Sequence, residues 1–347
     1  MNDGWSVSYI DSQQMNGDKL ASIIADIPQN NPKLDGIVLI KNGKLIVDQY
    51  YNGYHADSLH KIWSITKLVS GTCIGIASDN NLLSIDDSII NYLEEFAPDN
   101  PSELSNITIK HLLTMTSGLD WVELGGPGSI GYQLPYSDNW VSFVLKQSKK
   151  HPAGELYNYS TGNSILLAPI LKKSTGTTTE KFAQKHLFGP LEIRNFQWDT
   201  QNEFWTKTQS GELPGSVIPK SLNDKISALD FANTGSGLHM RLRDIAKIGQ
   251  LYLNDGKWND EQILSKRWIE ESIHPQSNNN QYGYHWRLTT FNGEECYYTT
   301  GFGLQRLYVF PRLDMVLALS QQHYQTMAEG DLTTQILIKE LITTVFK

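Results

Sequence analysis

Two strand-like runs near the start of the chain are joined by the dipeptide Asn42-Gly43, and this junction strongly limits the possible folds. Asparagine and glycine accept the positive φ angles of a two-residue hairpin turn, so residues 36–51 predict two antiparallel strands. Further strand-like runs lie near the other end, at Glu295–Tyr298, Arg306–Phe310 and Met315–Ser320. The sequence therefore predicts a sheet that takes strands from both ends of the chain.

Between these two groups of strands the apolar residues recur mostly at helical spacing, beginning with Ile65, Leu68, Val69 and Ile76. Residues Leu242–Leu253 and Thr333–Phe346 also predict amphipathic helices, which we expect to cover the sheet. The expected fold class is α+β: an antiparallel sheet flanked by helices, with an inserted, mainly helical lobe. One domain, residues 1–347, would divide into a sheet lobe (1–60 and 220–347) and a helical lobe (61–219).

The amino-acid composition of the chain argues against some classes of binding partner. The formal net charge of -8 argues against nucleic acid, because nucleic-acid binders present a basic surface to the phosphates. No stretch approaches the roughly 20 apolar residues of a membrane span, so we expect no membrane insertion. The first five residues lack the order of a signal peptide. The compartment stays open: periplasmic or secreted if a leader precedes residue 1, otherwise cytoplasmic.

Cysteine and histidine are placed unfavourably for a metal site. The two cysteines, Cys73 and Cys296, are expected to be buried thiols, and none of the nine histidines lies at ligand spacing from a partner. We therefore expect neither a metal nor another cofactor.

Ser64-Ile65-Thr66-Lys67 is the first motif with chemical content. Three-residue spacing on a helix places Ser64 and Lys67 on one face, within mutual reach. A serine hydroxyl needs a nearby base to become a nucleophile, and a desolvated lysine can serve. The alternative is a serine that only caps an exposed helix. Gly71 and Gly75 continue the same face and predict that other backbone approaches this helix closely.

Four sequence blocks, in order, resemble the class C β-lactamase-like serine hydrolases, which include family VIII carboxylesterases, D,D-peptidases and 6-aminohexanoate-dimer hydrolases. The blocks are residues 63–70, 107–120, 152–160 and 300–305 followed by 311–316. The resemblance implies a β-lactamase/D,D-peptidase-like fold over nearly the whole chain. It also implies that Ser64 is the nucleophile and that Lys67 helps to activate it.

The second catalytic element of that family is a tyrosine, and Tyr159-Ser160-Thr161 matches its pattern. By resemblance, Tyr159 would relay protons between Ser64 and the leaving group. Tyr157 is the alternative, and either tyrosine could instead serve only in packing.

The third element corresponds to Thr299-Thr300-Gly301, where β-lactamases carry Lys-Thr-Gly. The family places an oxyanion donor just after this glycine, so the backbone amides of Ser64 and Phe302 are the expected pair. The missing cation at position 299 removes a partner for a substrate carboxylate, and Thr161 replaces the asparagine of the lactamases. Both departures favour esters and amides over β-lactams.

Other expected substrate contacts are Thr161, Thr299, Thr300, Gly301, Trp63 and Tyr132. Tyr132 lies in a Gly/Pro/Ser-rich segment, 125–137, which we interpret as a loop.

The predicted function is hydrolysis of a small, uncharged ester or amide through an acyl-enzyme. One alternative is a β-lactamase or D,D-peptidase that takes a lactam, with Arg306 supplying the missing cation. The other is a penicillin-binding-like sensor without catalysis.

Overall fold

The computed structural model describes residues 3–9, 13–98, 101–124, 128–203, 231–279 and 281–345. In these ranges the strands are β1 Ser6–Val7, β2 Leu34–Lys41, β3 Lys44–Tyr50, β4 His60–Lys61, β5 Phe196–Trp198, β6 Leu238–Met240, β7 Lys257–Trp258, β8 Glu261–Gln262, β9 Arg287–Phe291, β10 Glu294–Gly301, β11 Gln305–Phe310 and β12 Met315–Gln321. The helices are α1 Gly17–Asn30, α2 Ile65–Asp79, α3 Ile90–Leu93, α4 Ile109–Leu113, α5 Ile130–Gln133, α6 Trp140–Leu145, α7 Thr161–Ile165, α8 Leu167–Thr175, α9 Thr179–Ala183, α12 Leu242–Leu253, α13 Lys266–Ser272 and α14 Met327–Ile342. Shorter helical turns are η2 Glu94–Phe96, η3 Pro101–Leu104, η4 Leu134–Tyr136, η5 Gln184–Phe188 and η7 Pro311–Leu313.

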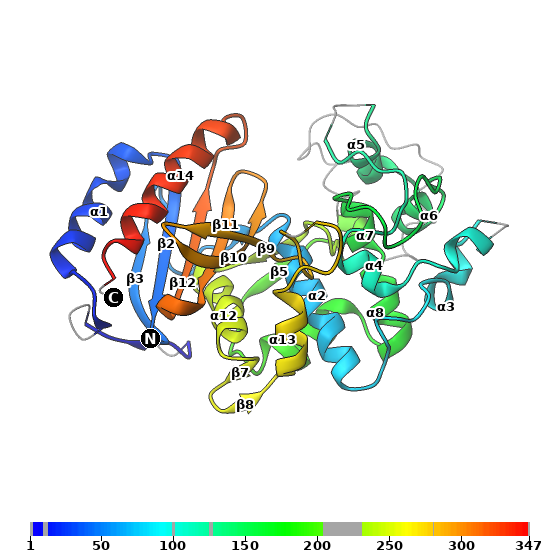
Figure 1. Cartoon of the computed structure of the whole chain (residues 1–347), viewed down its shortest axis with the longest axis horizontal. Helices are drawn as coiled ribbons and strands as arrows, with labels where there is room; N and C mark the ends of the chain where they lie inside the picture. The colour runs from blue at the N-terminus through cyan, green and yellow to red at the C-terminus, as the bar shows by residue number, and fades with distance from the viewer. Residues whose placement is uncertain are drawn as a thin grey trace.

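The main sheet joins the two ends of the chain, as predicted. Its order is β1-β3-β2-β12-β11-β10-β9, and Figure 1 shows the blue N-terminal strands beside the orange C-terminal ones. Leu39 of β2 lies opposite Leu317 of β12 at this junction. The expected antiparallel pairing has one exception in the described sheet, because the short edge strand β1 runs parallel to β3.

The predicted hairpin is confirmed by its backbone angles. Asn42 and Gly43 have φ angles of 50° and 67°, as a two-residue turn of this kind requires. A second turn of the same composition, Asn292-Gly293, joins β9 to β10 with φ angles of 50° and 78°. Both turns fix the register of their hairpins, and the second one sets the position of β10.

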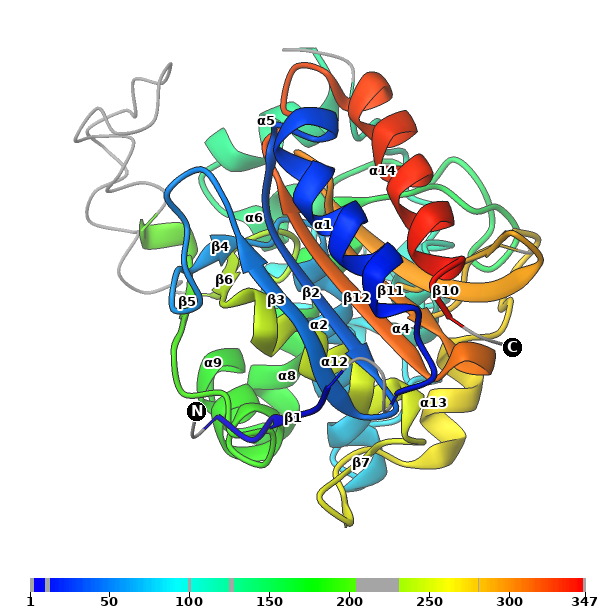
Figure 2. The same ribbon diagram turned by 90° about the vertical axis from the view of Figure 1, so that its left-hand side faces the viewer.

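Helices cover both faces of the sheet. Figure 2 shows α1 and α14 lying across one face, and α12 packs against β12 and β11 on the other. The predicted bounds of α12 are confirmed. Helix α14 runs from Met327 to Ile342, so it starts before the predicted Thr333 and ends before the predicted Phe346. Its first turns contain Gly330, which packs against the His323 ring, a contact that helical periodicity does not reveal.

Helix α2 is the central element of the molecule. Every residue from Ile65 to Ala77 is buried, as expected for a helix surrounded on all sides. One buried cluster runs from Val38 and Ile40 of the sheet into the helical region. The division into two lobes therefore stays an interpretation, and its boundary at 219/220 lies outside the described residues. Among the helices that are described, none has the length and apolar character needed to span a bilayer.

The segment 125–137 is only partly a loop. Residues 125–127 lie outside the described part, whereas Ile130–Gln133 and Leu134–Tyr136 form α5 and η4. The Ser129 side chain accepts a hydrogen bond from the Tyr132 amide and so caps α5. Reading the glycines and prolines as loop signals missed this cap.

Candidate active site

Ser64 and Lys67 meet at the start of α2, as their spacing predicts. Lys67 Nζ lies 3.0 Å from Ser64 Oγ and donates a hydrogen bond to the Gly235 carbonyl at 2.7 Å. The lysine side chain is 2% exposed, and within the described ranges no carboxylate forms an ion pair with it. The Ser64 side chain makes no capping hydrogen bond, so its hydroxyl faces the lysine instead of the helix amides. This geometry argues against the alternative of a purely capping serine.

Trp63, directly before Ser64, has a φ angle of 50°. A bulky residue in this left-handed region carries backbone strain of about 1–3 kcal/mol, so its surroundings must hold it there. The Lys61 ammonium lies 4.7 Å from the Trp63 ring centroid and is itself fixed by Asp199 at 3.0 Å. The turn into α2 is therefore held from outside the helix.

Gly71 and Gly75 allow close packing on the Ser64 face, although the neighbours are rings and not the expected backbone. A Cβ at Gly71 would lie 2.9 Å from His285 Cδ2, and one at Gly75 would lie 2.5 Å from Trp268 Cε2. Burial, with a further contribution from the Lys67 charge, lowers the pKa of His285 to about 3. His285 is therefore a neutral side chain behind the lysine.

The two candidate tyrosines have different neighbours. The Tyr159 ring contacts two basic side chains, with its centroid 5.2 Å from Lys67 Nζ and 5.4 Å from the Arg287 guanidinium carbon. Tyr157 instead packs against Tyr282, with 5.0 Å between ring centroids. Burial, partly offset by the Arg287 charge, raises the pKa of Tyr157 to about 12. The surroundings favour Tyr159 as the partner of Lys67.

The end of β10 approaches the start of α2 very closely. A Cβ at Gly301 would lie 2.4 Å from the Ile62 carbonyl oxygen, so no other residue fits without a shift. This contact brings the following residue, Phe302, beside Trp63, with 5.3 Å between ring centroids. The amides of Ser64 and Phe302 thus belong to two backbone segments in contact, as an oxyanion hole requires. Thr299 is buried, whereas Thr300 is half-buried.

Thr161 and Tyr132 have other partners. The backbone N–H of Thr161 donates to Glu123 Oε2 at 2.8 Å, and its hydroxyl donates to the other oxygen of the same carboxylate. Tyr132 is exposed and packs against Tyr136. Roles for Thr161 and Tyr132 in substrate binding stay predictions.

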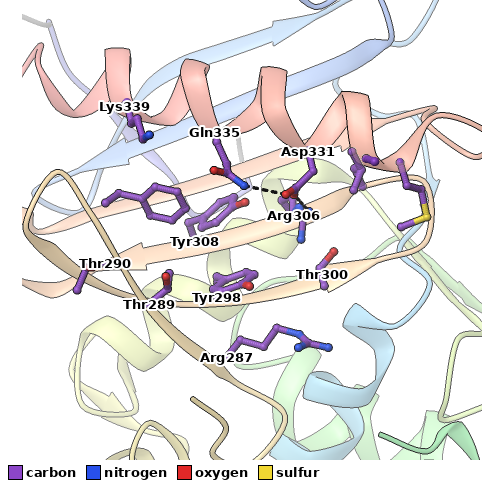
Figure 3. Close-up of a pocket in the computed structure, with 14 residues that line it drawn as sticks. Arg287, Thr289, Thr290, Tyr298, Thr300, Arg306, Tyr308, Asp331, Gln335 and Lys339 are labelled. Atoms are coloured by element: carbon purple, nitrogen blue, oxygen red, sulfur yellow. Dashed lines mark hydrogen bonds and ion pairs between the residues drawn. The ribbon is translucent and has the colours of Figure 1, made fainter. Parts of the chain in front are cut away.

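A groove of about 540 Å³ lies between β9–β11 and α14, where Figure 3 shows Tyr298, Thr300 and Arg287 on its strand side. Arg287 lines this groove and also touches the Tyr159 ring, so the groove and the Ser64 site share this cation. Arg306, also on its lining, forms an ion pair with Asp331. No carboxylate among the described residues pairs with Arg287 in this way.

Three neighbours of the site carry no motif: Gly235, Glu123 and Arg287. Gly235 follows Asn233, whose side chain accepts hydrogen bonds from the amides of residues 235 and 236 and so fixes the loop that presents the carbonyl to Lys67. The sequence does show the tight turn at Asn292-Gly293 before β10, and it shows polar residues at positions 123 and 287. No short-range pattern, however, connects these residues with Ser64. Only the packing of distant segments does so.

Comparisons with known proteins concern the family and the fold of the chain. Residues 33–339 match the family described as Beta-lactamase. The 6-aminohexanoate-dimer hydrolase of Paenarthrobacter ureafaciens is 22% identical over 331 residues, which cover 86% of this chain and 76% of that protein. A solved structure, the putative 6-aminohexanoate-dimer hydrolase from Bacillus anthracis, superposes with a TM-score of 0.71 at 18% identity and covers 99% of this chain and 89% of that one.

A further relative is much longer than the matching part of this chain. Protein flp of Staphylococcus aureus (strain MW2) is 23% identical over 174 residues, which make up 48% of this chain but only 35% of that protein. The chain thus spans about a third of that relative's length.

Proposed function

The chain belongs to the beta-lactamase family, and we propose that it is a serine hydrolase that cleaves a small ester or amide through a covalent acyl-enzyme. The observation that carries this proposal is the buried Lys67 amino group, whose Nζ lies 3.0 Å from the Ser64 hydroxyl at the start of a central helix. An activated nucleophile needs a base within hydrogen-bond reach, and this pair supplies both. The relative from Paenarthrobacter ureafaciens, by its name, hydrolyses the 6-aminohexanoate dimer.

The proposed reaction has two steps. Ser64 Oγ attacks the substrate carbonyl carbon while its proton passes to the amine form of Lys67, and the amides of Ser64 and Phe302 donate to the oxyanion. Tyr159 then delivers its proton to the leaving alcohol or amine as the bond to the carbonyl carbon breaks, and Lys67 passes the proton taken from Ser64 on to Tyr159. Water attacks the acyl-enzyme, its proton follows the same path in reverse, and Ser64 is released.

The preferred substrate is neutral. Threonine at position 299 offers no charge to a carboxylate, and Arg306 is engaged by Asp331. A second candidate function, β-lactamase or D,D-peptidase, is favoured by one observation: Arg287 brings a cation from β9 to the Tyr159 ring. In that case Arg287, and not Arg306, would hold the substrate carboxylate.

A fluorophosphonate probe tests the nucleophile. Intact mass of the wild-type chain should show one adduct, and Ser64→Ala should show none. Ser105→Ala, at an exposed serine, serves as the matched control and should label like the wild type. An unlabelled wild type would favour the sensor alternative. Equal labelling of Ser64→Ala and the wild type would contradict the assignment of Ser64 as the nucleophile.

Two chromogenic substrates separate the candidate functions. Turnover of p-nitrophenyl butyrate with none of nitrocefin is the expected result. Nitrocefin turnover that disappears in Arg287→Met, with butyrate turnover retained, would support the second candidate instead.

A further inference from the structure

Three aromatic side chains from distant segments meet beside Ser64. Trp63, Phe302 and Tyr324, here called the aromatic wall, have ring centroids 5.3 Å (Trp63–Phe302), 6.2 Å (Trp63–Tyr324) and 5.4 Å (Phe302–Tyr324) apart. Phe302 is 39% and Tyr324 41% exposed, although large apolar side chains are usually more buried. The wall therefore presents apolar surface to solvent next to the proposed nucleophile.

The wall is built into the backbone that would hold the oxyanion. Tyr324 packs on Gly303, where a Cβ would lie 2.5 Å from the tyrosine ring, and Gly303 itself has a φ angle of 77°. The Gly303 carbonyl accepts a hydrogen bond from the His323 amide at 3.1 Å. The segment between β12 and α14 thus rests on the turn that carries Phe302. A fixed, ordered surface of this kind suits ligand contact better than a mobile one.

The direction of the substrate follows from the proposed chemistry. A tetrahedral intermediate on Ser64 directs its oxyanion to the amides of Ser64 and Phe302 and its leaving group to the proton donors. The Tyr159 ring contacts Lys67 and Arg287. The rings of the aromatic wall instead contact Lys61 and one another. The acyl chain is the remaining substituent, and the wall is adjacent in the chain to both oxyanion amides, because Trp63 directly precedes Ser64 and Phe302 itself carries the second amide.

We propose that the aromatic wall binds the apolar acyl chain of the substrate and sets the preferred chain length, with Tyr324 as a specificity-determining residue. This inference rests on the proposed function. Lys61, whose ammonium lies 4.7 Å from the Trp63 ring centroid, forms an ion pair with Asp199, which offsets its charge beside an uncharged chain. Each methylene that the wall buries should raise kcat/KM by up to about fourfold.

An acyl series tests the proposal: kcat/KM for p-nitrophenyl acetate, butyrate and hexanoate. The hexanoate-to-acetate ratio of the wild type should fall by about fivefold or more in Tyr324→Ala and return in Tyr324→Phe. Tyr9→Ala, at a tyrosine that is 89% exposed, is the control and should keep the wild-type ratio. Circular dichroism confirms that each variant is folded.

A second series of esters tests whether the acyl group or the alcohol group of the substrate contacts the aromatic wall. Ethyl and hexyl acetate share one acyl group and differ only in the alcohol, so their ratio should be the same in wild type and Tyr324→Ala. An unchanged acyl ratio, or a loss confined to the alcohol series, would overturn the inference while the hydrolase assignment stands. A wild type that turns over none of these esters would overturn both.

Discussion

Tyr157 and Tyr159 are two positions apart, yet they have different neighbours. Alternation along an extended segment would place both on one face, and sequence alone left the choice open. In the structure only the Tyr159 ring lies over Lys67. Tyr157, with its pKa raised to about 12 mainly by burial, holds its proton too firmly to relay it near neutral pH.

Phenylalanine substitutions check this assignment. Tyr159→Phe should lower kcat/KM for p-nitrophenyl butyrate by about 100-fold or more, the usual contribution of a positioned proton donor. Tyr157→Phe is the matched control and should retain most of the activity. The reverse pattern would assign the relay to Tyr157.

Gly301 is the residue at which β10 touches the start of α2. Gly301→Ala would place a methyl group 2.4 Å from the Ile62 carbonyl oxygen and push Phe302 away from Ser64. Because displacements of about 1 Å in an active site can cost 100-fold in rate, we expect kcat/KM to fall at least about tenfold. Gly128→Ala, where no described atom beyond the adjacent residues lies within 4 Å of the added methyl, should be silent.

Helix α2 shows what periodicity predicts at the scale of an element. Its 3.6-residue repeat placed Ser64, Lys67, Gly71 and Gly75 on one face because that repeat is a property of the local backbone. The rings that fill the space over the two glycines come from elsewhere: His285 precedes β9, and Trp268 lies in α13. The glycines signalled a close approach without identifying the neighbour.

Gly75→Ala tests this packing. A methyl group 2.5 Å from the buried Trp268 ring should lower the free energy of unfolding by about 1–3 kcal/mol, reduced by up to about 1 kcal/mol from the better helix propensity of alanine. Urea unfolding at neutral pH measures the change. Ser78→Ala, on the same helix but only partly buried, should equal or exceed the wild type in stability; equal losses in both variants would contradict the packing argument.

Buried histidines, His60 and His285 among them, couple the stability of the molecule to pH. Burial lowers the pKa of His60 to about 4, and burial with the Lys67 charge lowers that of His285 to about 3. An unfolded histidine titrates near pH 6.5, so below that pH the unfolded chain binds protons that the folded chain refuses. The free energy of unfolding should therefore fall as pH drops from about 6.5 towards 4.

His60→Asn should flatten that dependence. His60 contributes a slope of up to about 1.4 kcal/mol per pH unit in this window, and the variant removes that contribution. Urea unfolding between pH 4.5 and 7.5 gives the slope. The control is His55→Asn, at an exposed histidine, which should keep the wild-type slope. A His60→Asn slope equal to that of the wild type would refute the assignment.

The sequence by itself determined the local features of this protein. The Asn42-Gly43 turn, the bounds of α12 and the shared face of Ser64 and Lys67 follow from backbone preferences and repeats that act over a few residues. The four sequence blocks added the family and hence the overall fold.

Tertiary structure decided which distant groups surround Ser64. Lys67 bonds to a carbonyl 168 positions away, and Phe302 reaches Trp63 only because Gly301 lets β10 touch α2. Arg287 likewise brings a cation to Tyr159 from the strand next to β10. Such contacts depend on how elements pack against one another in three dimensions, which a repeat of two or 3.6 residues does not encode.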